Sequence, residues 1–337
     1  RCRADVNATL SVTGLILLGA DARFECGTAS TPFSGRLAIV IRGDRRFADA
    51  DPSVSEEAGT RGVLVMHGAE LSLFGDDARS APVRLSGTAA AGARSFTVSE
   101  AVNWQAGDTI VVSSTGFDRR EIEQRIIASV DGTTVTVTEP LSFLHYGEIQ
   151  TYEDVADQER YVLDQRAYVV NLTRSIAFRA AADAWSEAQH GGHLMVMMGG
   201  RAFVDGVEFQ RFGQMGKLGR YPFHWHLMGD VDGQLIRRSS IHDSFNRCVV
   251  VHSTNRARVI DNVCYNHFGH GFFLEEGNEE ANILSGNIGI LSKKVPEDRA
   301  LLVTEFNIGP ADRFPGPSTF WIPHPNNAVH DNVAIGS

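Results

Sequence analysis

Short β-type segments recur at a nearly constant interval in the second half of the chain. Two of them, SSIHDSFNRCVVVHS (239 to 253) and DNVCYNHFGHGFFLE (261 to 275), align with an offset of 22 residues. VEFQRFG and NILSGNIGI are further copies. A period of about 20 to 25 residues with several short strands per copy is typical of a parallel β-helix, whose coils stack about 4.8 Å apart. We therefore predict a right-handed parallel β-helix over at least residues 165 to 337.

The remainder of the chain is also of β type. Helical periodicity is nearly absent, and Asp131-Gly132 in RIIASVDGTTVTVTEP indicates a hairpin turn. We expect an all-β protein with a β-rich domain over 1 to 80, a β-rich connecting segment over 81 to 150 and the β-helix over 151 to 337. The segment 292 to 317 is long for a coil turn and is predicted to be an inserted loop, either a binding lid or a mobile segment. Asparagines are predicted to lie at coil corners in left-handed backbone, namely Asn246, Asn262, Asn266, Asn282 and Asn287.

Strand alternation places two histidines on one outer face. In GRYPFHWHLMGD (219 to 230), His224 and His226 are two residues apart and point the same way. The opposite, apolar set must face the core, and it consists of Phe223, Trp225 and Leu227. In the next coil Val249 and Val251 are expected to face inward, which sets His252 beside His226.

The 22-residue offset extends this pattern to a third coil. It stacks Val249 on Gly271 and Val251 on Phe273. The outward residues of this coil are then His270, Phe272, Leu274 and Glu276. One coil before the paired histidines, His193 begins the similar strand HLMVMM. The outer face of these coils is therefore a predicted histidine patch.

The patch is a candidate metal centre. Two imidazoles on one strand face lie about 6.6 Å apart at Cα and can share a metal ion when a neighbouring strand supplies a third ligand. We predict a divalent metal, zinc, bound by His224 and His226 with His193 or His252 completing the set, and an open position for water or a sugar oxygen. A calcium site elsewhere is left open. The alternative is a purely structural ladder of stacked, hydrogen-bonded histidines.

Other side chains expected near the patch could act on a substrate. The acid or base candidates are Asp230, Glu276 and His270, since glycosidic cleavage usually requires two carboxyl groups and a lyase requires a base and a cation. Arg220 and Arg247 could pair with uronate carboxylates. The alternatives are a coil-corner hydrogen bond for Glu276 and apolar packing of the arginine stems.

Four segments resemble one known family in order and spacing. GRYPFHWHLMGD, SIHDSFNRCVVVHSTN, GHGFFLEEGNEEAN and STFWIPHPNN are similar to the β-helical region of the cell-surface hyaluronidase and the cell-migration-inducing hyaluronan-binding protein, a family that also includes fibrocystin-like proteins. LLGADARFECGTASTPFSGRLAIVIRGD resembles the second half of the eight-glycine domain that precedes that region, so we expect a partial domain there. The Ala-, Arg- and Asp-rich composition indicates a bacterial relative.

The resemblance implies a secreted or cell-surface protein that acts on hyaluronan or a related anionic polysaccharide. With the histidine patch, it favours a metal-assisted depolymerase that cleaves glycosidic bonds within the chain. The alternatives are a polysaccharide-binding or adhesive β-helix without turnover and a polysaccharide lyase.

Charge and cysteine usage limit the other possibilities. The net charge of −10 argues against general binding to nucleic acid, and no apolar run is long enough for a membrane segment. Residues 211 to 258 nevertheless carry a local excess of five positive charges, which suits either an anionic ligand or solvated strand ends. Cys2 and Cys26 are predicted to lie close enough for a disulfide, Cys248 to face outward near the patch, and Cys264 to sit at a corner.

Overall fold

The computed structural model describes residues 1–3, 6–44, 46–50, 54, 58–76, 81–154, 156, 158–182, 189–306 and 316–336. The chain divides into two compact units, one formed by Arg1–Asp77 with Arg174–Ile335 and the other by Ala78–Thr173. The expected boundary at residue 151 falls inside strand β12 (Gln150–Asp154), which belongs to the second unit. In the described part of the chain, no helix is long and apolar enough to cross a membrane.

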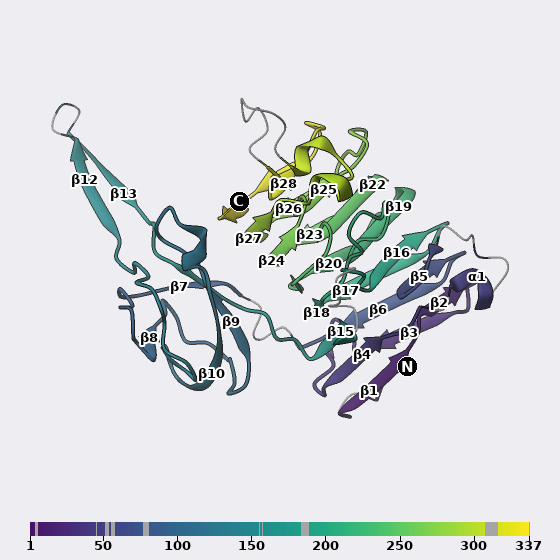
Figure 1. The fold of residues 1–337 in the computed structure, drawn as a ribbon, viewed down its shortest axis with the longest axis horizontal. Helices are drawn as coiled ribbons and strands as arrows, with labels where there is room; N and C mark the ends of the chain where they lie inside the picture. Colours follow the sequence, from purple (N-terminus) through teal and green to yellow (C-terminus); the bar gives the residue numbers. More distant parts are fainter. Residues whose placement is uncertain are drawn as a thin grey trace. The chain divides into compact units, whose positions relative to one another are not determined.

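The larger unit is a parallel β-helix with three sheets (Figure 1). Sheet 1 has the order β1 (Ala8–Val12), β4 (Leu37–Ile41), β15 (Ile176–Ala180), β18 (Val207–Gln210), β21 (Ser240–His242), β24 (Val263–Phe268), β27 (Ile288–Lys293) and β30 (Val333–Ile335). Sheet 2 has the order β2 (Leu15–Leu18), β5 (Gly62–Met66), β16 (His193–Met197), β19 (Phe223–Asp230), β22 (Val249–Asn255), β25 (Phe272–Leu274) and β28 (Phe320–Trp321). Sheet 3 has the order β3 (Arg23–Cys26), β6 (Glu70–Phe74), β17 (Arg201–Asp205), β20 (Leu235–Arg237), β23 (Arg258–Ile260), β26 (Ile283–Ser285) and β29 (Ala328–His330).

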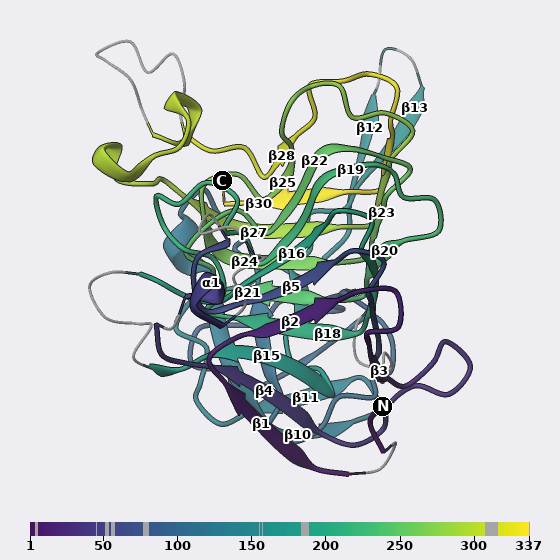
Figure 2. The same ribbon diagram turned by 90° about the vertical axis from the view of Figure 1, so that its right-hand side faces the viewer.

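The strands described within the first 76 residues form the first two coils of this β-helix. Strands β1 to β3 make one coil and β4 to β6 the next, and β4 pairs in parallel with β15 after the chain has passed through the second unit. Figure 2 shows β2, β5, β16 and β19 stacked in one sheet. The β-helix therefore extends beyond the predicted residues 165 to 337. The segment 1 to 80, expected to be a separate N-terminal domain, supplies its first coils.

The β-helix core consists of the inward side chains of all three sheets. Phe223, Trp225, Val249 and Val251 are all buried in it, as the alternation predicts. Equivalent residues of successive coils also stack, because parallel coils repeat at the strand spacing. The rings of Phe178 in β15 and Phe209 in β18, for example, lie 5.3 Å apart and nearly parallel.

The predicted 22-residue register is wrong by one residue. Ser240 pairs with Val263, an offset of 23 residues, and Val249 pairs with Phe272 rather than Gly271. Because strand side chains alternate with a period of two, this slip exchanges the two faces of β25. Its inward residues are Phe272 and Leu274.

Alternation also fails at Leu227. Its backbone is in the left-handed region (φ 53°), and the pairing of β19 with β22 shifts between His226 and Gly229. The irregularity turns Leu227 toward solvent, where it is exposed rather than in the core as predicted.

Both cysteine pairs form disulfides. The predicted bond between Cys2 and Cys26 is present. Cys248 and Cys264 form a second one and are fully buried in the core, so their predicted outward and corner positions are wrong. The backbone N–H groups of Cys248 and Val249 both donate to the carbonyl oxygen of Gly271, which interrupts alternation where β22 begins.

The asparagines form hydrogen-bonded ladders between coils. The Asn262 side-chain amide donates to Asn287 Oδ1 at 3.0 Å, and Asn287 donates in turn to Asn332 Oδ1 at 3.0 Å. Of the five asparagines predicted to have left-handed backbone, only Asn266 does (φ 55°). At several corners the residue before the ladder asparagine takes that conformation instead, as Asp261 does before Asn262.

The second unit is an antiparallel β domain. Its six-stranded sheet has the order β7 (Val83–Arg84), β14 (Tyr168–Asn171), β9 (Thr109–Val112), β10 (Glu123–Asp131), β11 (Thr134–Val137) and β8 (Ser95–Thr97). The predicted Asp131-Gly132 turn joins β10 to β11. Strands β12 and β13 (Glu159–Leu163) form a separate hairpin.

The described helices are short. They are α1 (Phe47–Ala50), η2 (Arg119–Glu121), η4 (Glu297–Arg299) and η5 (Val303–Glu305). The last two lie in the predicted inserted segment 292 to 317, of which residues 307–315 fall outside the described residues.

Candidate metal centre

Three histidines meet on the outer face of sheet 2. His224 and His226 come from β19, and the pairing of β19 with β22 sets His226 beside His252, as predicted. The Nδ1 atoms of His226 and His252 are 3.1 Å apart. One ligand nitrogen from each of the three residues lies within 4.8 Å of the other two. These residues, called the histidine cluster below, satisfy the spacing that a shared metal ion requires.

His224 has the hydrogen bonding of a metal ligand. Its Nδ1 lies 3.1 Å from the Gly219 carbonyl oxygen, which fixes Nδ1 as the protonated nitrogen and leaves a lone pair on Nε2. Nε2 is buried and has no hydrogen-bond partner among the described residues. Burial lowers the pKa of His224 well below its usual value, and the neighbouring His226 and His252 lower it further, so the ring is neutral at pH 7. A metal-ligating histidine commonly donates its other N–H to a carbonyl in this way.

Two adjacent carboxylates flank His252. Glu275 Oε2 lies 3.6 Å from His252 Nδ1 and 4.0 Å from His224 Nε2, on the side of the cluster facing β25. Glu276 Oε1 lies 3.2 Å from His252 Nε2, and its side chain is 53% exposed. Glu275 could therefore serve as a further ligand of a metal ion at the cluster, and Glu276 could orient the His252 ring.

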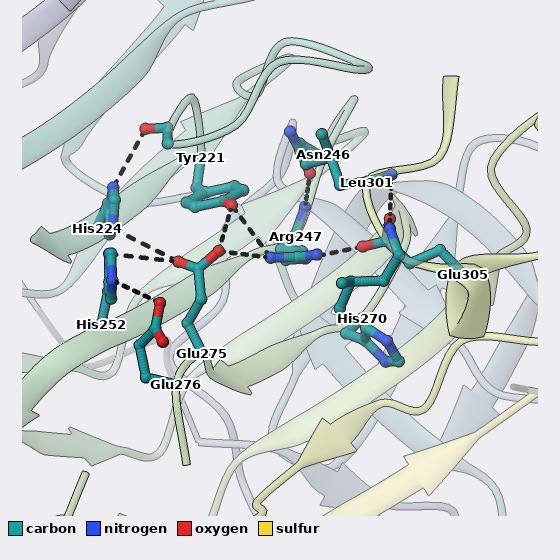
Figure 3. Close-up of polar contacts among 12 residues, drawn as sticks. Tyr221, His224, Asn246, Arg247, His252, His270, Glu275, Glu276, Leu301 and Glu305 are labelled. Atoms are coloured by element: carbon teal, nitrogen blue, oxygen red, sulfur yellow. Dashed lines mark hydrogen bonds and ion pairs between the residues drawn. The ribbon is translucent and has the colours of Figure 1, made fainter. Parts of the chain in front are cut away.

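A buried chain of polar contacts holds Glu275 (Figure 3). Its Oε1 accepts hydrogen bonds from the Tyr221 hydroxyl at 2.9 Å and from Arg247 Nη1 at 3.1 Å. Arg247 is 1% exposed, and its Nε donates to Glu305 Oε1 at 2.8 Å. Because these contacts occupy Oε1, Oε2 remains directed at the histidines.

The cluster opens into a cavity of about 510 Å³. Its polar lining includes the three histidines, Glu275 and Arg220. Its apolar lining residues are Val54, Ala58, Met66, Met195, Met197, Met198 and Leu218. Met198 and Leu218 are exposed, so part of this apolar lining is accessible to solvent.

The remaining predicted site residues lie outside the cluster. His193 is buried two residues before Met195 on β16, edge-on to the Phe47 ring at 6.2 Å, and it is not among the converging ligands. His270 is buried, packs on Phe273 and lies 3.0 Å from the Thr304 hydroxyl through Nε2. Burial lowers the pKa of His270 to about 4. Asp230 is exposed at the end of β19 and pairs with Arg256 at 3.3 Å.

Internal ion pairs neutralise much of the basic zone over residues 211 to 258. Arg237 and Arg238 both bond Asp205, and Arg256 pairs with Asp230. Arg247, predicted to bind substrate, is instead buried between two carboxylates. Among the arginines of this zone, Arg220 lines the cavity.

Glu275 and Tyr221 were missed by the sequence reasoning. The one-residue register error turned Glu275 inward, and a 23-residue offset would have placed it beside His252. Tyr221 lies before the first residue of β19, where alternation gives no signal.

Comparisons with known proteins agree with this architecture. Residues 2–86 match the G8 domain model, and residues 189–337 match the CEMIP beta-helix model. Fibrocystin-L of Mus musculus is 32% identical over 95% of this chain and 8% of its own length. Cell surface hyaluronidase CEMIP2 of Homo sapiens is 34% identical over 70% of this chain and 19% of its own length.

Other matches are more distant. Protein rliB of Dictyostelium discoideum is 27% identical over 99% of this chain and 29% of its own length, so the chain spans less than a third of each of these relatives. Among solved structures, the tailspike gp61 of Pseudomonas phage phi297 is 14% identical, with a TM-score of 0.25 over 84% of this chain and 40% of that chain. The two model matches, with the parallel β-helix that both matched segments build, show that this chain belongs to the family that joins a G8 domain to a CEMIP beta-helix.

Proposed function

We propose that the protein is a metal-dependent depolymerase of hyaluronan or a related uronate-bearing polysaccharide. The observation that carries the proposal is the convergence of three histidines and Glu275 at an open cavity, with the buried Nε2 of His224 lacking a partner. A buried imidazole nitrogen without a hydrogen-bond partner is costly, and a metal ion would satisfy it.

The donor set suits a divalent transition metal such as zinc. Imidazole nitrogens and one carboxylate oxygen are ordinary zinc ligands. The Gly219 carbonyl and Glu276 would orient His224 and His252 through the nitrogens that face away from the metal. When bound, such an ion supplies a Lewis acid that polarises a substrate oxygen or activates a water molecule.

The protein's own residues position the substrate and the ligands. Arg247 and Tyr221 fix the Glu275 carboxylate, and Arg220 offers a positive charge at the cavity for a uronate. The exposed apolar side chains of Met198 and Leu218 suit the apolar faces of sugar rings. The two disulfides are typical of an extracellular protein, and one relative is named a cell surface hyaluronidase.

A non-catalytic polysaccharide-binding module is the second candidate. It is favoured by the positions of Asp230 and His270, two of the three predicted acid or base groups, which lie away from the cluster. Such a module would use the same cavity without turnover.

A degradation assay separates the two candidates. The purified protein, treated with a chelator and then given Zn²⁺, is incubated with hyaluronan and chondroitin, and new reducing ends and unsaturated uronates are measured. We expect metal-dependent release of reducing ends. The His224→Ala/His226→Ala variant should be inactive, and His330→Ala, which removes an exposed histidine elsewhere, should be fully active.

The outcome also distinguishes hydrolysis from elimination. Unsaturated uronates would identify a lyase. Binding of polysaccharide without new chain ends, with or without metal, would leave the binding module as the function.

A further inference from the structure

Methionines gather at the same cavity as the histidine cluster. The chain has six methionines, and four of them, Met66, Met195, Met197 and Met198, line this cavity. Met66 and Met195 are almost fully buried. The concentration of thioethers at one place is the feature to be explained.

Two of these methionines stand directly beside the metal-ligand candidates. Met195 of β16 pairs with His224 of β19, and Met197 pairs with His226. Paired residues of parallel strands project on the same side, about 4.8 Å apart. The Met195 methyl carbon also lies 3.3 Å from the position that a Cβ would take on Gly219, whose carbonyl oxygen faces His224 Nδ1. The thioethers and the imidazoles therefore share one surface.

Met195 and Met197 pack in an apolar cluster with Phe47 and Leu64 on this outer face, a role that branched aliphatic residues could also fill. The inward residues of β16 are Leu194 and Val196, so the same strand uses branched aliphatic residues in the core. Two coils earlier, the outward residues of β2 are Ile16 and Leu18. Strands favour β-branched and aromatic side chains over flexible ones such as methionine. The outward residues are Leu64 and Met66 in β5 and Met195 and Met197 in β16, so methionine replaces the branched aliphatic residues as the coils approach the histidines.

The histidine cluster thus lies between soft thioether groups on one side and a hard carboxylate group on the other. Glu275 borders it on the β25 side, and Met195 and Met197 border it on the β16 side. Thioethers select Cu(I), imidazoles bind copper and zinc, and carboxylates suit harder cations. We propose that the cavity binds copper and that Met195 and Met197 stabilise its monovalent state beside His224 and His226. The proposal rests on the metal centre of the proposed function and specifies its metal.

The metal alone provides the test. Cu(I) is titrated anaerobically, with ascorbate as reductant and bicinchoninate as competing chelator, into the wild type, Met195→Leu/Met197→Leu and the control Met215→Leu, whose methionine is buried away from the cavity. Zn²⁺ binding is measured in parallel. We expect the double variant to lose Cu(I) affinity by about 10- to 100-fold, while Zn²⁺ affinity stays unchanged and the control matches the wild type.

Each other outcome overturns the inference. Equal Cu(I) affinity in the wild type and the double variant would show that the thioethers are not ligands. Parallel loss of Cu(I) and Zn²⁺ affinity would assign the methionines to packing. Zn²⁺ binding with depolymerase activity but no methionine-dependent Cu(I) binding would refute the copper site and leave the proposed function intact, whereas failure to bind either metal would refute both.

Discussion

The β-helix carries two clusters of histidine and carboxylate side chains, and they differ in whether the second nitrogen of the buried histidine has a hydrogen-bond partner. On the outer face of sheet 1, His242 Nδ1 lies 3.0 Å from Asp243 and its Nε2 lies 3.4 Å from Glu208, so both nitrogens have carboxylate partners. On the outer face of sheet 2, His224 Nε2 has no hydrogen-bond partner among the described residues, and Glu275 Oε2 lies 4.0 Å from it.

The difference separates a histidine with two carboxylate partners from one whose second nitrogen is open to a ligand. Burial lowers the pKa of His242, but the hydrogen bonds with Asp243 and Glu208 outweigh it and raise the pKa to about 9. Burial instead dominates at His224 and lowers its pKa well below the usual value. At pH 7 the His242 imidazole is a cation in an ion pair, and the His224 imidazole is a neutral base with a lone pair on Nε2. Both clusters consist of histidine and carboxylate side chains, so only the partners of the second imidazole nitrogen distinguish His242 from His224.

The largest expected effect is the loss of metal binding in His224→Ala/His226→Ala. The variant removes two of the three imidazoles proposed to bind the metal, so the protein should retain no Zn²⁺ after dialysis, as measured by elemental analysis. Both side chains lie on the outer face, so the circular dichroism spectrum should keep its β-sheet signal. His242→Gln should bind Zn²⁺ like the wild type. If the double variant retained its metal, the histidine cluster would have no more role in metal binding than His242 has.

Arg247→Met should cause the next largest effect. It leaves Glu275 and Glu305 without their shared cation, and breaking a buried ion pair typically costs about 3 to 5 kcal/mol. The free energy of unfolding in urea measures this loss. Arg256→Met is the matched control, since its exposed pair with Asp230 contributes about 1 kcal/mol at most. Equal effects of the two substitutions would contradict the buried network.

The pH dependence of stability should reveal the charged state of His242. Its folded pKa of about 9 exceeds the unfolded value of about 6.5, so its contribution is complete below pH 6.5 and is lost as pH rises through 9. Between pH 6 and pH 10 the wild type should lose up to about 3 kcal/mol more unfolding free energy than His242→Gln. Parallel pH profiles of the two proteins would show that His242 is not a paired cation.

The smallest expected effect concerns Glu276. Glu276→Gln keeps the shape of the side chain but removes the charge beside His252 Nε2, so Zn²⁺ affinity should fall about tenfold. Glu280→Gln, which changes an exposed carboxylate bonded to Asn326, should not alter it. If Glu276→Gln bound Zn²⁺ as tightly as the wild type, the partner of the second nitrogen would matter at His224 but not at His252.

Much of this site could be predicted because it follows from a repeating pattern. In β19, apolar and polar residues alternate clearly enough to fix Phe223 and Trp225 as inward, and aligning β22 with that strand places His226 beside His252. Glu275 could not be predicted because GFFLE is apolar at three successive positions, so alternation does not show which phenylalanine faces the core. Packing decides this, since Phe272 stacks between Val249 and Phe320 of the adjacent coils.

The sequence by itself determined the periodic features: the parallel β-helix, the outward His224 and His226, and a first disulfide. The β-helix and the outward histidines depend on local alternation and on a repeat that any stacked coil must satisfy. Only the tertiary structure decided the features that depend on the ends of strands and on contacts across coils. The shared Gly271 carbonyl turns Cys248 into the core, the left-handed Leu227 ends the alternation of β19, and buried Arg247 joins Glu275 to Glu305 across 30 residues of sequence. Such contacts have no period, because they are set by which side chains fill the space between coils.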